Sequence, residues 1–394
     1  MTRGIRQGTG LRRFLPRASQ NTFPAMHLKN RLPSFARFLL LGPLACACLA
    51  AESSGASSAG FVRADSPEIL VEGRTATSPE GGLRMGFPGV TLHLKFEGSD
   101  LGFRVKASSN DVYFDVSVDG AAPVRLQAKE GEGLYPLFHS ATPGVHRISI
   151  VRRTESWEGV CEVQGFELGK GGRLLAPDPL PARKLEFIGD SITCGSSIDV
   201  RPGEPQLGNQ RSDANLTFAM ELGRRFHAQV YLVSYGGRGV IRDWQGIRDT
   251  NNAPQFYERA LPDDPKSHWD PRRYVPDAIG ICLGTNDFNQ GIPDQNEFVN
   301  AYVEFVRKVR RDAPNAWIFL IGSPIVWDEP GKPPRGSVLN AYIAEVVQKL
   351  DDPRVEAAPV HHYPGHSYDA HPTAAEHQAM ATELEPRFRK ALGW

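Results

Sequence analysis

The chain has 394 residues, of which 40% are hydrophobic and 23% are charged. Since single domains typically have about 100–200 residues, this length predicts two domains with packed cores. The 45 basic residues balance the 45 acidic ones, and a formal net charge of zero provides no overall field that would attract nucleic acid or an anionic membrane. The composition therefore excludes binding to polyanions driven by net charge and favours a neutral substrate.

Residues 1–51 are typical of a signal and processing region. Basic residues precede the apolar run 38–50, which ends in small residues, and this order predicts export as a secreted or periplasmic protein. The run is shorter than the roughly 20 residues of a membrane-spanning helix, so we expect no stable span. A lipoprotein anchor at Cys46 or Cys48 stays open as a weaker alternative.

Three cysteines follow this region, at positions 161, 194 and 282. An odd number of widely spaced cysteines does not form a disulfide framework, even in an oxidising compartment. We expect buried thiols that pack as small apolar groups, with one disulfide as the alternative.

The first domain is predicted to be a small all-β sandwich over residues 61–172, after a Ser/Ala/Gly linker at 52–60. Its sequence alternates apolar and polar residues in short runs such as 90–96 and 112–118, and a turn signal, Asp119-Gly120, follows the second run. This pattern indicates antiparallel strands and a sandwich of jelly-roll type. Nothing in this stretch assembles into a catalytic set.

The second domain is predicted at residues 184–394, after a stiff, proline-rich linker at 173–183. Short apolar runs suited to buried strands occur at 185–188, 230–233, 278–283 and 317–321. Helical patterns run from an Asp213 cap to about His227, over 298–309, over 339–350, and from a Thr373 cap to about Leu392. This order predicts an α/β fold, with a parallel sheet between helices and ligands at the carboxyl ends of the strands.

Ser191 follows the first expected strand of this domain, between Gly189 and Gly195. Flanking glycines allow a sharp turn that leaves the hydroxyl accessible at the edge of the sheet, where a nucleophile is useful. Gly-Asp-Ser alone is a weak pattern, and a serine that caps a helix is the alternative.

Three further segments supply the partners that a serine nucleophile needs. Asn286 follows the third expected strand and can direct an amide donor at an oxyanion, and the Gly-rich block 234–239 can expose a backbone N–H. His371 precedes the last helix and offers a base. Each residue alone has a structural explanation, an Asx-turn for Asn286 and a helix entry for His371. Together they meet the requirements of acyl transfer.

The order of these segments resembles the SGNH (GDSL) hydrolase superfamily. Its four blocks correspond to Gly-Asp-Ser-Ile-Thr (189–193), the Gly-rich block (234–239), Gly-Thr-Asn-Asp (284–287) and Asp-x-His-Pro (369–372). The resemblance covers about Lys184 to Trp394. It implies that Ser191 is the nucleophile and an oxyanion donor through its N–H, that Asn286 is a side-chain donor and that His371 is the base, with no cofactor. Spacing favours Gly239 as the glycine donor, with Gly237 as the alternative.

The last block departs from the usual pattern of the superfamily. An Asp is expected three residues before the histidine, but Tyr368 occupies that position and Asp369 lies only two residues before His371. Asp369 is therefore an uncertain third catalytic residue. The chain also resembles carbohydrate esterase family 2, which implies a Ser-His dyad with a backbone carbonyl orienting the imidazole, and this is the arrangement we expect.

Carbohydrate esterase family 2 resembles the chain more closely. Members share a small jelly-roll domain ahead of the hydrolase domain, a Gly-Arg-Gly block as at 237–239, and an Asp-x-His-Pro ending. The resemblance implies a secreted esterase that removes acetyl groups from plant cell-wall polysaccharide, xylan or glucomannan, or from oligosaccharides. An SGNH lipase or thioesterase acting on another acyl ester is one alternative, since the blocks determine the chemistry and not the substrate. A carbohydrate-binding protein without activity is the other.

Other residue types give weaker signals. Trp244, Trp269 and Trp327 lie near expected strand ends and are candidates for stacking on sugar rings, although burial explains each equally well. The histidines between 361 and 377 lack a metal-binding pattern such as HExxH, so we expect no metal site. The chain also lacks a phosphate-binding Gly loop, which argues against nucleotide hydrolysis.

Overall fold

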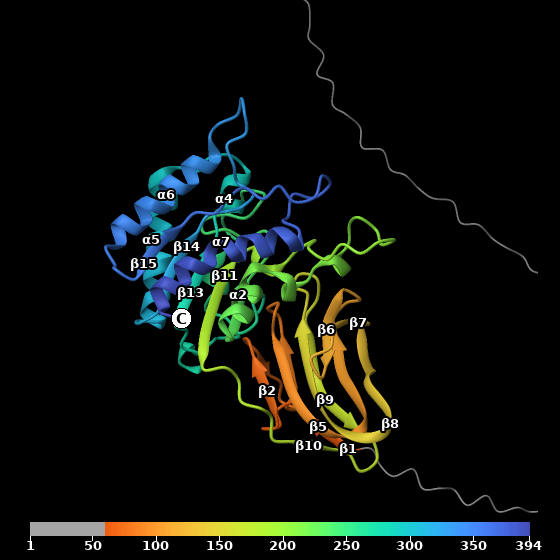
Figure 1. Ribbon diagram of the computed structural model, residues 1–394. Helices are drawn as coiled ribbons and strands as arrows, with labels where there is room; N and C mark the ends of the chain where they lie inside the picture. The colour runs from red at the N-terminus through yellow and green to blue at the C-terminus, as the bar shows by residue number, and fades with distance from the viewer. Residues whose placement is uncertain (1–59) are drawn as a thin grey trace, which may run out of the picture. The chain divides into compact units, whose positions relative to one another are not determined.

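The computed structural model describes residues 60–394 (Figure 1). The predicted signal region and nearly all of the predicted linker at 52–60 lie outside the described residues. Within 60–394, no helix is long and apolar enough to cross a membrane.

The first part of the described chain is an antiparallel β domain. Its strands are β1 (Gly60–Arg63), β2 (Ile69–Glu72), β3 (Ala76–Thr77), β4 (Leu83–Met85), β5 (Thr91–Ala107), β6 (Val112–Val118), β7 (Val124–Ala128), β8 (Gly131–Arg152), β9 (Cys161–Leu168) and β10 (Arg173–Leu175). The main path of the sheet runs β3-β4-β9-β5-β8-β6-β7, and β1, β2 and β10 pair with β9 or β5. This pairing confirms the antiparallel prediction, whereas the jelly-roll arrangement remains a prediction.

The core of the β domain is built on phenylalanines that alternate along its strands. Phe103 on β5 meets Phe114 edge-on at 5.3 Å between ring centroids and stacks on Phe166 at 5.6 Å. All three rings are fully buried. The long strands β5 and β8 pair along almost their whole length, with register shifts near Gly98 and Leu101 that bend the ladder.

Both predicted linker ranges overlap strands of this domain. Gly60 already belongs to β1, and residues 173–175 form β10, which pairs with β5. The prolines at 177, 179 and 181 suggested a linker that begins at residue 173. A strand forms at its start because Leu174 in β10 packs against the core of the domain.

The second part is an α/β domain with a five-stranded parallel sheet. Its strands are β11 (Arg183–Gly189), β12 (Ala228–Ser234), β13 (Ala278–Cys282), β14 (Trp317–Ile321) and β15 (Val355–Ala358), in the spatial order β12-β11-β13-β14-β15. All neighbouring pairs are parallel. The four strands expected from the sequence are present. The edge strand β15 was not predicted, because Val-Glu-Ala-Ala is neither an apolar run nor rich in β-branched residues.

Helices cover both faces of this sheet (Figure 1). They are α1 (Ser191–Cys194), α2 (Phe218–Phe226), α3 (Ala253–Phe256), α4 (Thr285–Asn289), α5 (Gln295–Asp312), α6 (Arg335–Leu350) and α7 (Ala374–Leu392), with 3₁₀ turns at η1 (Asn209–Arg211), η2 (Ala214–Leu216) and η3 (Pro271–Arg273). Leu185 and Phe187 on β11 pack with α2 and α7, whereas Ile188 packs with the cluster that includes α5 and α6. This two-residue alternation places the helices on both faces.

The helix ends correct one prediction and confirm another. Asp213 does not begin a long helix, because it caps the 3₁₀ turn η2, and the extended backbone of Thr217 separates that turn from α2, which Thr217 caps. Thr373 caps α7 as predicted, with Glu376 completing a capping box.

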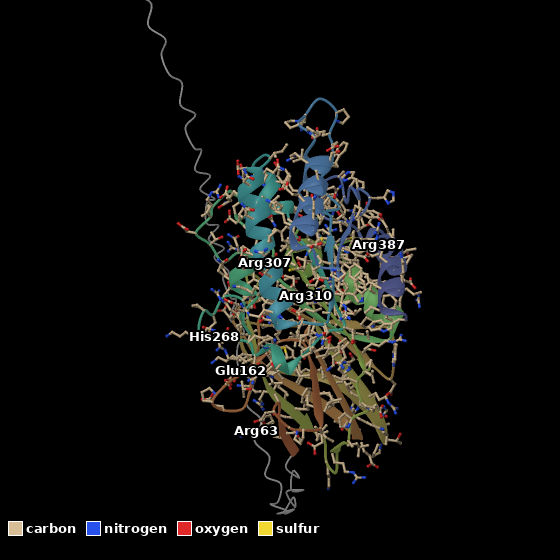
Figure 2. The ribbon with its side chains drawn as sticks, turned by 90° about the vertical axis from the view of Figure 1, so that its left-hand side faces the viewer. Arg63, Glu162, His268, Arg307, Arg310 and Arg387 are labelled. Carbon is tan, nitrogen blue, oxygen red and sulfur yellow. The ribbon has the colours of Figure 1, made fainter. Side chains whose placement is uncertain are left out.

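The carboxyl end of α5 is held by Arg310. Its guanidinium donates to the carbonyl oxygens of Ala313 at 3.1 Å and Ala316 at 2.7 Å, and to the Asp352 carboxylate at 2.8 Å. Figure 2 labels Arg310 with Arg307, one turn earlier on the same helix. The contact satisfies carbonyl groups beyond the helix end and fixes the entry to β14.

A buried ion pair joins the β domain to the sheet of the α/β domain. Arg74, in the β2–β3 connection, donates to Glu186 on β11 at 2.8 Å, with the two side chains 2% and 5% exposed. The guanidinium lies 5.1 Å from the ring of Tyr257 and 5.2 Å from that of Trp269. Burial raises the pKa of Glu186, and the charge of Arg74 opposes this effect.

Replacing Arg74 with Met keeps much of the packing but leaves the Glu186 carboxylate buried without a counter-charge. We expect the substitution to lower the free energy of unfolding by about 3–5 kcal/mol, measured by denaturant unfolding. Arg272→Met removes an exposed pair with Asp270 and serves as the matched control, expected to unfold like the wild type. Equal stability of the two variants would contradict a structural role for the buried pair.

Candidate active site

The predicted site residues meet at the carboxyl edge of the parallel sheet. β11 lies between β12 and β13, so the chain leaves these neighbouring strands in loops that begin side by side. Ser191 follows β11, the Gly-rich block follows β12, and Asn286 follows β13. His371 lies in the loop between β15 and α7. The strand order reverses direction at β11, which is where open α/β sheets form their ligand crevices.

Ser191 is the first residue of the short helix α1. The carboxylate of Asp190 caps this helix by accepting the N–H of Ile192 at 3.1 Å. The N–H of Ser191 has no acceptor within the helix and is free to serve a ligand. Gly189 is required because a Cβ there would lie 2.0 Å from Thr193 Oγ1. Asp190 is fully buried, and this burial raises its pKa to about 6.

Ser191, His371 and Asp369 form a continuous hydrogen-bonded chain. His371 Nε2 lies 2.8 Å from Ser191 Oγ, and His371 Nδ1 lies 2.5 Å from Asp369 Oδ1. The expected dyad, with a backbone carbonyl on the imidazole, is therefore wrong for this structure. A carboxylate on Nδ1 stabilises the tautomer that leaves Nε2 able to accept the serine proton.

Asp369 can reach the imidazole of His371 from only two residues earlier because the chain turns sharply around Asp369. The Asp369 N–H donates to the His366 carbonyl at 3.1 Å, and Asp369 Oδ1 accepts the backbone N–H of His371 at 3.1 Å. The second contact is the side-chain-to-backbone bond of an Asx-turn, which folds the carboxylate back over the residue two positions later. The same oxygen then reaches the imidazole of that residue.

The pKa values of this pair shift in opposite directions. Burial by itself raises the pKa of Asp369, but the hydrogen bond and charge of His371, together with the Ser197 hydroxyl, hold it below its usual range. Burial lowers the pKa of His371, but Asp369, assisted by the charges of Asp190 and Glu155, raises it above 6.5. The arrangement favours a charged carboxylate and stabilises the imidazolium that forms when the base takes a proton.

Asn286 lies beside the Gly-rich block. Its Nδ2 donates to the Arg238 carbonyl at 2.9 Å, with a longer contact of 3.4 Å to Asp190 Oδ2. The Asn286 amide thus contacts the carbonyl side of the Arg238–Gly239 peptide, and Gly239 stays the predicted backbone donor, with Gly237 as the alternative. Both amide hydrogens have an acceptor in this arrangement, and the contact of 3.4 Å to Asp190 is the weaker one, which an oxyanion would replace.

Asp287 was not singled out by sequence reasoning, although it is the last residue of the Gly-Thr-Asn-Asp block. Its buried carboxylate accepts the N–H groups of Val240 at 3.0 Å and Ile241 at 2.8 Å. A Cβ on Gly239 would lie 2.3 Å from Asp287 Oδ2, so only glycine fits there. This carboxylate holds the far end of the Gly-rich block in place.

The tryptophans divide into two groups. Trp244 is 52% exposed, and its backbone N–H donates to the carbonyl of Gly237 at 2.9 Å. Trp327 is 38% exposed and stacks on His362 at 4.8 Å, in the loops after β14 and β15. Trp269 instead lies against Tyr231 and the guanidinium of Arg74, in the packing between the domains.

The β domain also reaches the site, which the sequence did not predict. Glu155, in the β8–β9 connection, accepts the N–H of Gly236 at 2.5 Å. Burial raises the pKa of the Glu155 carboxylate to about 7, and Trp157, which is 56% exposed in the same connection, opposes this rise. The sequence feature that could have indicated this contact is the polar segment 152–158. It follows an apolar run and carries one aromatic residue, Trp157.

The remaining histidines have separate surroundings. His361 pairs with Glu383, His366 stacks on Tyr368, and His377 is buried against Phe218. Among residues 60–394, no group of three or more His, Cys, Asp or Glu side chains is arranged to hold a metal ion. The three cysteines of this range are free and buried, as the thiol prediction states.

A separate groove lies on the β domain and does not contain these residues. It has a volume of about 670 Å³ and includes Arg63 and Glu162, both labelled in Figure 2. Its charged groups largely pair with one another or with nearby residues, as Glu162 does with Ser78 at 2.7 Å. The candidate site is therefore placed at Ser191 by its catalytic residues, and not at this groove by its volume.

Known proteins match both parts of the chain. Residues 71–178 match the carbohydrate esterase 2 N-terminal family, and residues 187–379 match the GDSL-like lipase/acylhydrolase family. An acetylxylan esterase/glucomannan deacetylase of Cellvibrio japonicus is 37% identical over 339 residues, which cover 86% of this chain and 93% of that protein. The cellulase/esterase CelE of Acetivibrio thermocellus is 30% identical over 341 residues, which cover 84% of this chain and 40% of that protein.

Solved structures agree with these matches. A family two carbohydrate esterase from Cellvibrio japonicus superposes with a TM-score of 0.81 at 37% identity, covering 86% of this chain and 99% of that one. A family two carbohydrate esterase from Clostridium thermocellum, in complex with cellohexaose, gives a TM-score of 0.76 at 29% identity, covering 83% and 99%.

Fold and similarity together define a carboxylic ester hydrolase with a GDSL-like α/β domain. The relative that is 37% identical is matched over 93% of its length, and both family models match this chain. The chain therefore belongs to carbohydrate esterase family 2.

Asp369→Asn tests whether the carboxylate contributes to catalysis. An amide can present its N–H to the imidazole and stabilise the wrong tautomer, so we expect kcat for p-nitrophenyl acetate to fall on the order of 10⁴-fold. Glu383→Gln, which changes an acid that contacts His361 and not His371, should leave kcat unchanged. A loss of tenfold or less for Asp369→Asn would restore the dyad.

The raised pKa of His371 predicts the pH dependence. The imidazole must be neutral to act as a base, so activity should be lost as the pH falls through a value above 6.5. The measurement is the acid limb of kcat/KM against pH with a substrate that does not ionise. An acid limb centred at or below pH 6.5 would show that burial, and not Asp369, dominates the pKa of His371.

Proposed function

We propose that the protein is an exported esterase that removes acetyl groups from plant cell-wall polysaccharide, xylan or glucomannan, by acyl transfer through Ser191, His371 and Asp369. The observation that carries the proposal is the chain of contacts from Ser191 Oγ to His371 Nε2 at 2.8 Å and from His371 Nδ1 to Asp369 Oδ1 at 2.5 Å. Export rests on the predicted signal region alone.

In the first half-reaction, His371 Nε2 takes the proton of the Ser191 hydroxyl as the oxygen attacks the acetyl carbonyl. The oxyanion of the tetrahedral intermediate accepts hydrogen bonds from the N–H groups of Ser191 and Gly239 and from Asn286 Nδ2. Each such donor typically contributes about 3–4 kcal/mol to lowering the barrier. The imidazolium, stabilised by Asp369, then protonates the sugar oxygen as the C–O bond breaks, which leaves an acetyl group on Ser191.

In the second half-reaction, water replaces the sugar alcohol. His371 Nε2 takes a proton from the water as its oxygen attacks the acetyl-serine carbonyl, and the same donors hold the new oxyanion. Collapse of this intermediate returns the proton to Ser191 Oγ and releases acetate. All proton transfers use one imidazole, and the chemistry requires no cofactor.

The substrate class is supported by similarity and by the surface near the site. The relative that is 37% identical is named an acetylxylan esterase/glucomannan deacetylase, and a similar structure was solved with cellohexaose. Trp244 and Trp327 are partly exposed, in the loops that follow β12 and β14. Exposed aromatic rings offer flat apolar faces with a polar edge, which suits the stacking of sugar rings. We therefore assign these two residues to substrate binding.

Acetate release from acetylated xylan, acetylated glucomannan and acetylated chitin oligomers, measured side by side, tests this proposal. We expect release from xylan or glucomannan and none with Ser191→Ala or His371→Ala. Both variants should unfold like the wild type, because the two side chains are only partly buried and lie outside the hydrophobic core. Hydrolysis of p-nitrophenyl acetate without release from any polysaccharide would favour the lipase or thioesterase alternative. A wild-type protein without activity on any ester would favour the carbohydrate-binding alternative.

Asn286→Ala probes the oxyanion site. Because the amide should interact chiefly with the transition state, we expect kcat to fall about 10²–10³-fold with little change in KM. Steady-state kinetics with p-nitrophenyl acetate separates the two parameters. If KM rose while kcat held, Asn286 would be a substrate-binding residue instead.

A further inference from the structure

The β8–β9 connection of the β domain is buried against the α/β domain. Arg153, which begins this connection, is fully buried and pairs with Asp115 at 2.9 Å, Asp199 at 2.6 Å and Asp213 at 3.3 Å. Its carbonyl accepts the N–H of Ala214 at 3.1 Å. One of these acids lies in the β domain and two in the α/β domain, so the pairs fix the connection on both sides.

Glu155 is the residue of this connection that reaches the catalytic loops. It is 1% exposed, and its Oε2 accepts the N–H of Gly236 at 2.5 Å. A Cβ on Gly236 would lie 2.5 Å from Glu155 Oε1, so the carboxylate lies directly against the backbone of the Gly-rich block. The thiol of Cys194, at the end of the helix that begins with Ser191, faces the same carboxylate.

The Gly-rich block is therefore held at both ends by buried carboxylates. Glu155 binds its first glycine, Gly236, and Asp287 binds the N–H of Val240, just after its last residue. The Arg238–Gly239 peptide, which lies against Asn286, is between these two anchors. A loop with two glycines in succession has many accessible backbone conformations, and each anchor reduces that freedom.

We propose that Glu155 is a positioning residue for ester hydrolysis: by holding Gly236, the β domain fixes the backbone N–H of Gly239 for the oxyanion. The proposal rests on the acyl-transfer mechanism above and extends it. The β domain is then a part of the active centre and not only an appended module. Glu155 touches no reacting atom, so it acts through the loop that it holds.

The hydrogen bond to Gly236 does not require a charge on Glu155. Burial raises the pKa of Glu155, and burial together with the charge of Glu155 raises that of Glu158, whose Oε2 accepts the Glu155 N–H at 2.8 Å. His371 and Glu158 are the charged groups near Glu155, and Arg152 in turn lies near Glu158. The Cys194 thiol faces Glu155 from α1. An uncharged acid still offers a carbonyl oxygen, and so does glutamine.

The test compares Glu155→Ala with Glu155→Gln in the full chain, using p-nitrophenyl acetate. We expect Glu155→Ala to lower kcat about 10- to 100-fold with KM within about twofold, because a displaced loop weakens an interaction with the transition state. Glu155→Gln keeps an acceptor for Gly236 and should remain within about threefold of wild type. Glu162→Ala, which changes an acid on the outer part of the β domain, is the control and should leave both parameters unchanged.

Two outcomes would overturn the proposal. One is a Glu155→Ala variant with wild-type kcat, or with a change in KM alone. The other is an equal loss of kcat in the Gln and Ala variants, since the hydrogen bond would then not be the cause. Inactive wild-type protein would instead remove the proposed function, and this inference with it.

Gly236→Ala keeps the proposal testable if Glu155→Ala does not fold. The added Cβ displaces the Glu155 carboxylate, so kcat should fall with KM unchanged. Wild-type kcat in Gly236→Ala would contradict the proposal.

Discussion

The hydrogen bond between Ser191 and His371 imposes the constraint on which the rest of the structure depends. The two residues are separated by 180 positions in the chain, yet their side-chain atoms lie 2.8 Å apart. The parallel sheet makes this meeting feasible, because every strand of a parallel sheet ends at the same edge and β11 lies in the interior of the strand order. Helices on both faces bury the sheet and leave that edge open, so the loops there carry the chemistry while the strands provide rigidity.

Buried carboxylates hold these loops in place. Asp190 caps the helix that begins with Ser191, Asp287 accepts the N–H groups that follow the Gly-rich block, and Glu155 accepts the N–H of Gly236. A buried acid is costly unless it is hydrogen-bonded, and backbone N–H groups of loops need acceptors, so each contact satisfies both groups. The ion pair of Arg74 with Glu186 ties the β domain to β11, the strand that leads to Ser191. The packing of the two domains therefore helps to hold the catalytic loops in place.

Local patterns in the sequence were sufficient for the motif residues and for most strands and helices. Ser191, Asn286 and His371 were found because each follows an apolar run or precedes a capped helix, and family resemblance joined them. Three features depended on geometry that local patterns do not encode. The Asx-turn that brings Asp369 onto the imidazole is set by backbone dihedral angles, β15 is stabilised by pairing with β14 rather than by propensity, and the contact of Glu155 with Gly236 joins two domains across 81 positions.

The proposed mechanism requires that Ser191 carries an acyl group during turnover, with His371 as its base. The most direct test is mass spectrometry of protein quenched in acid during turnover of p-nitrophenyl acetate, followed by proteolysis and peptide sequencing. The account predicts an acetyl group on the peptide that contains Ser191, assigned to that residue, and its absence from the His371→Ala variant quenched in the same way. Full activity without an acetylated Ser191 under conditions where deacetylation limits the rate, or acetylation at another residue that tracks turnover, would contradict it.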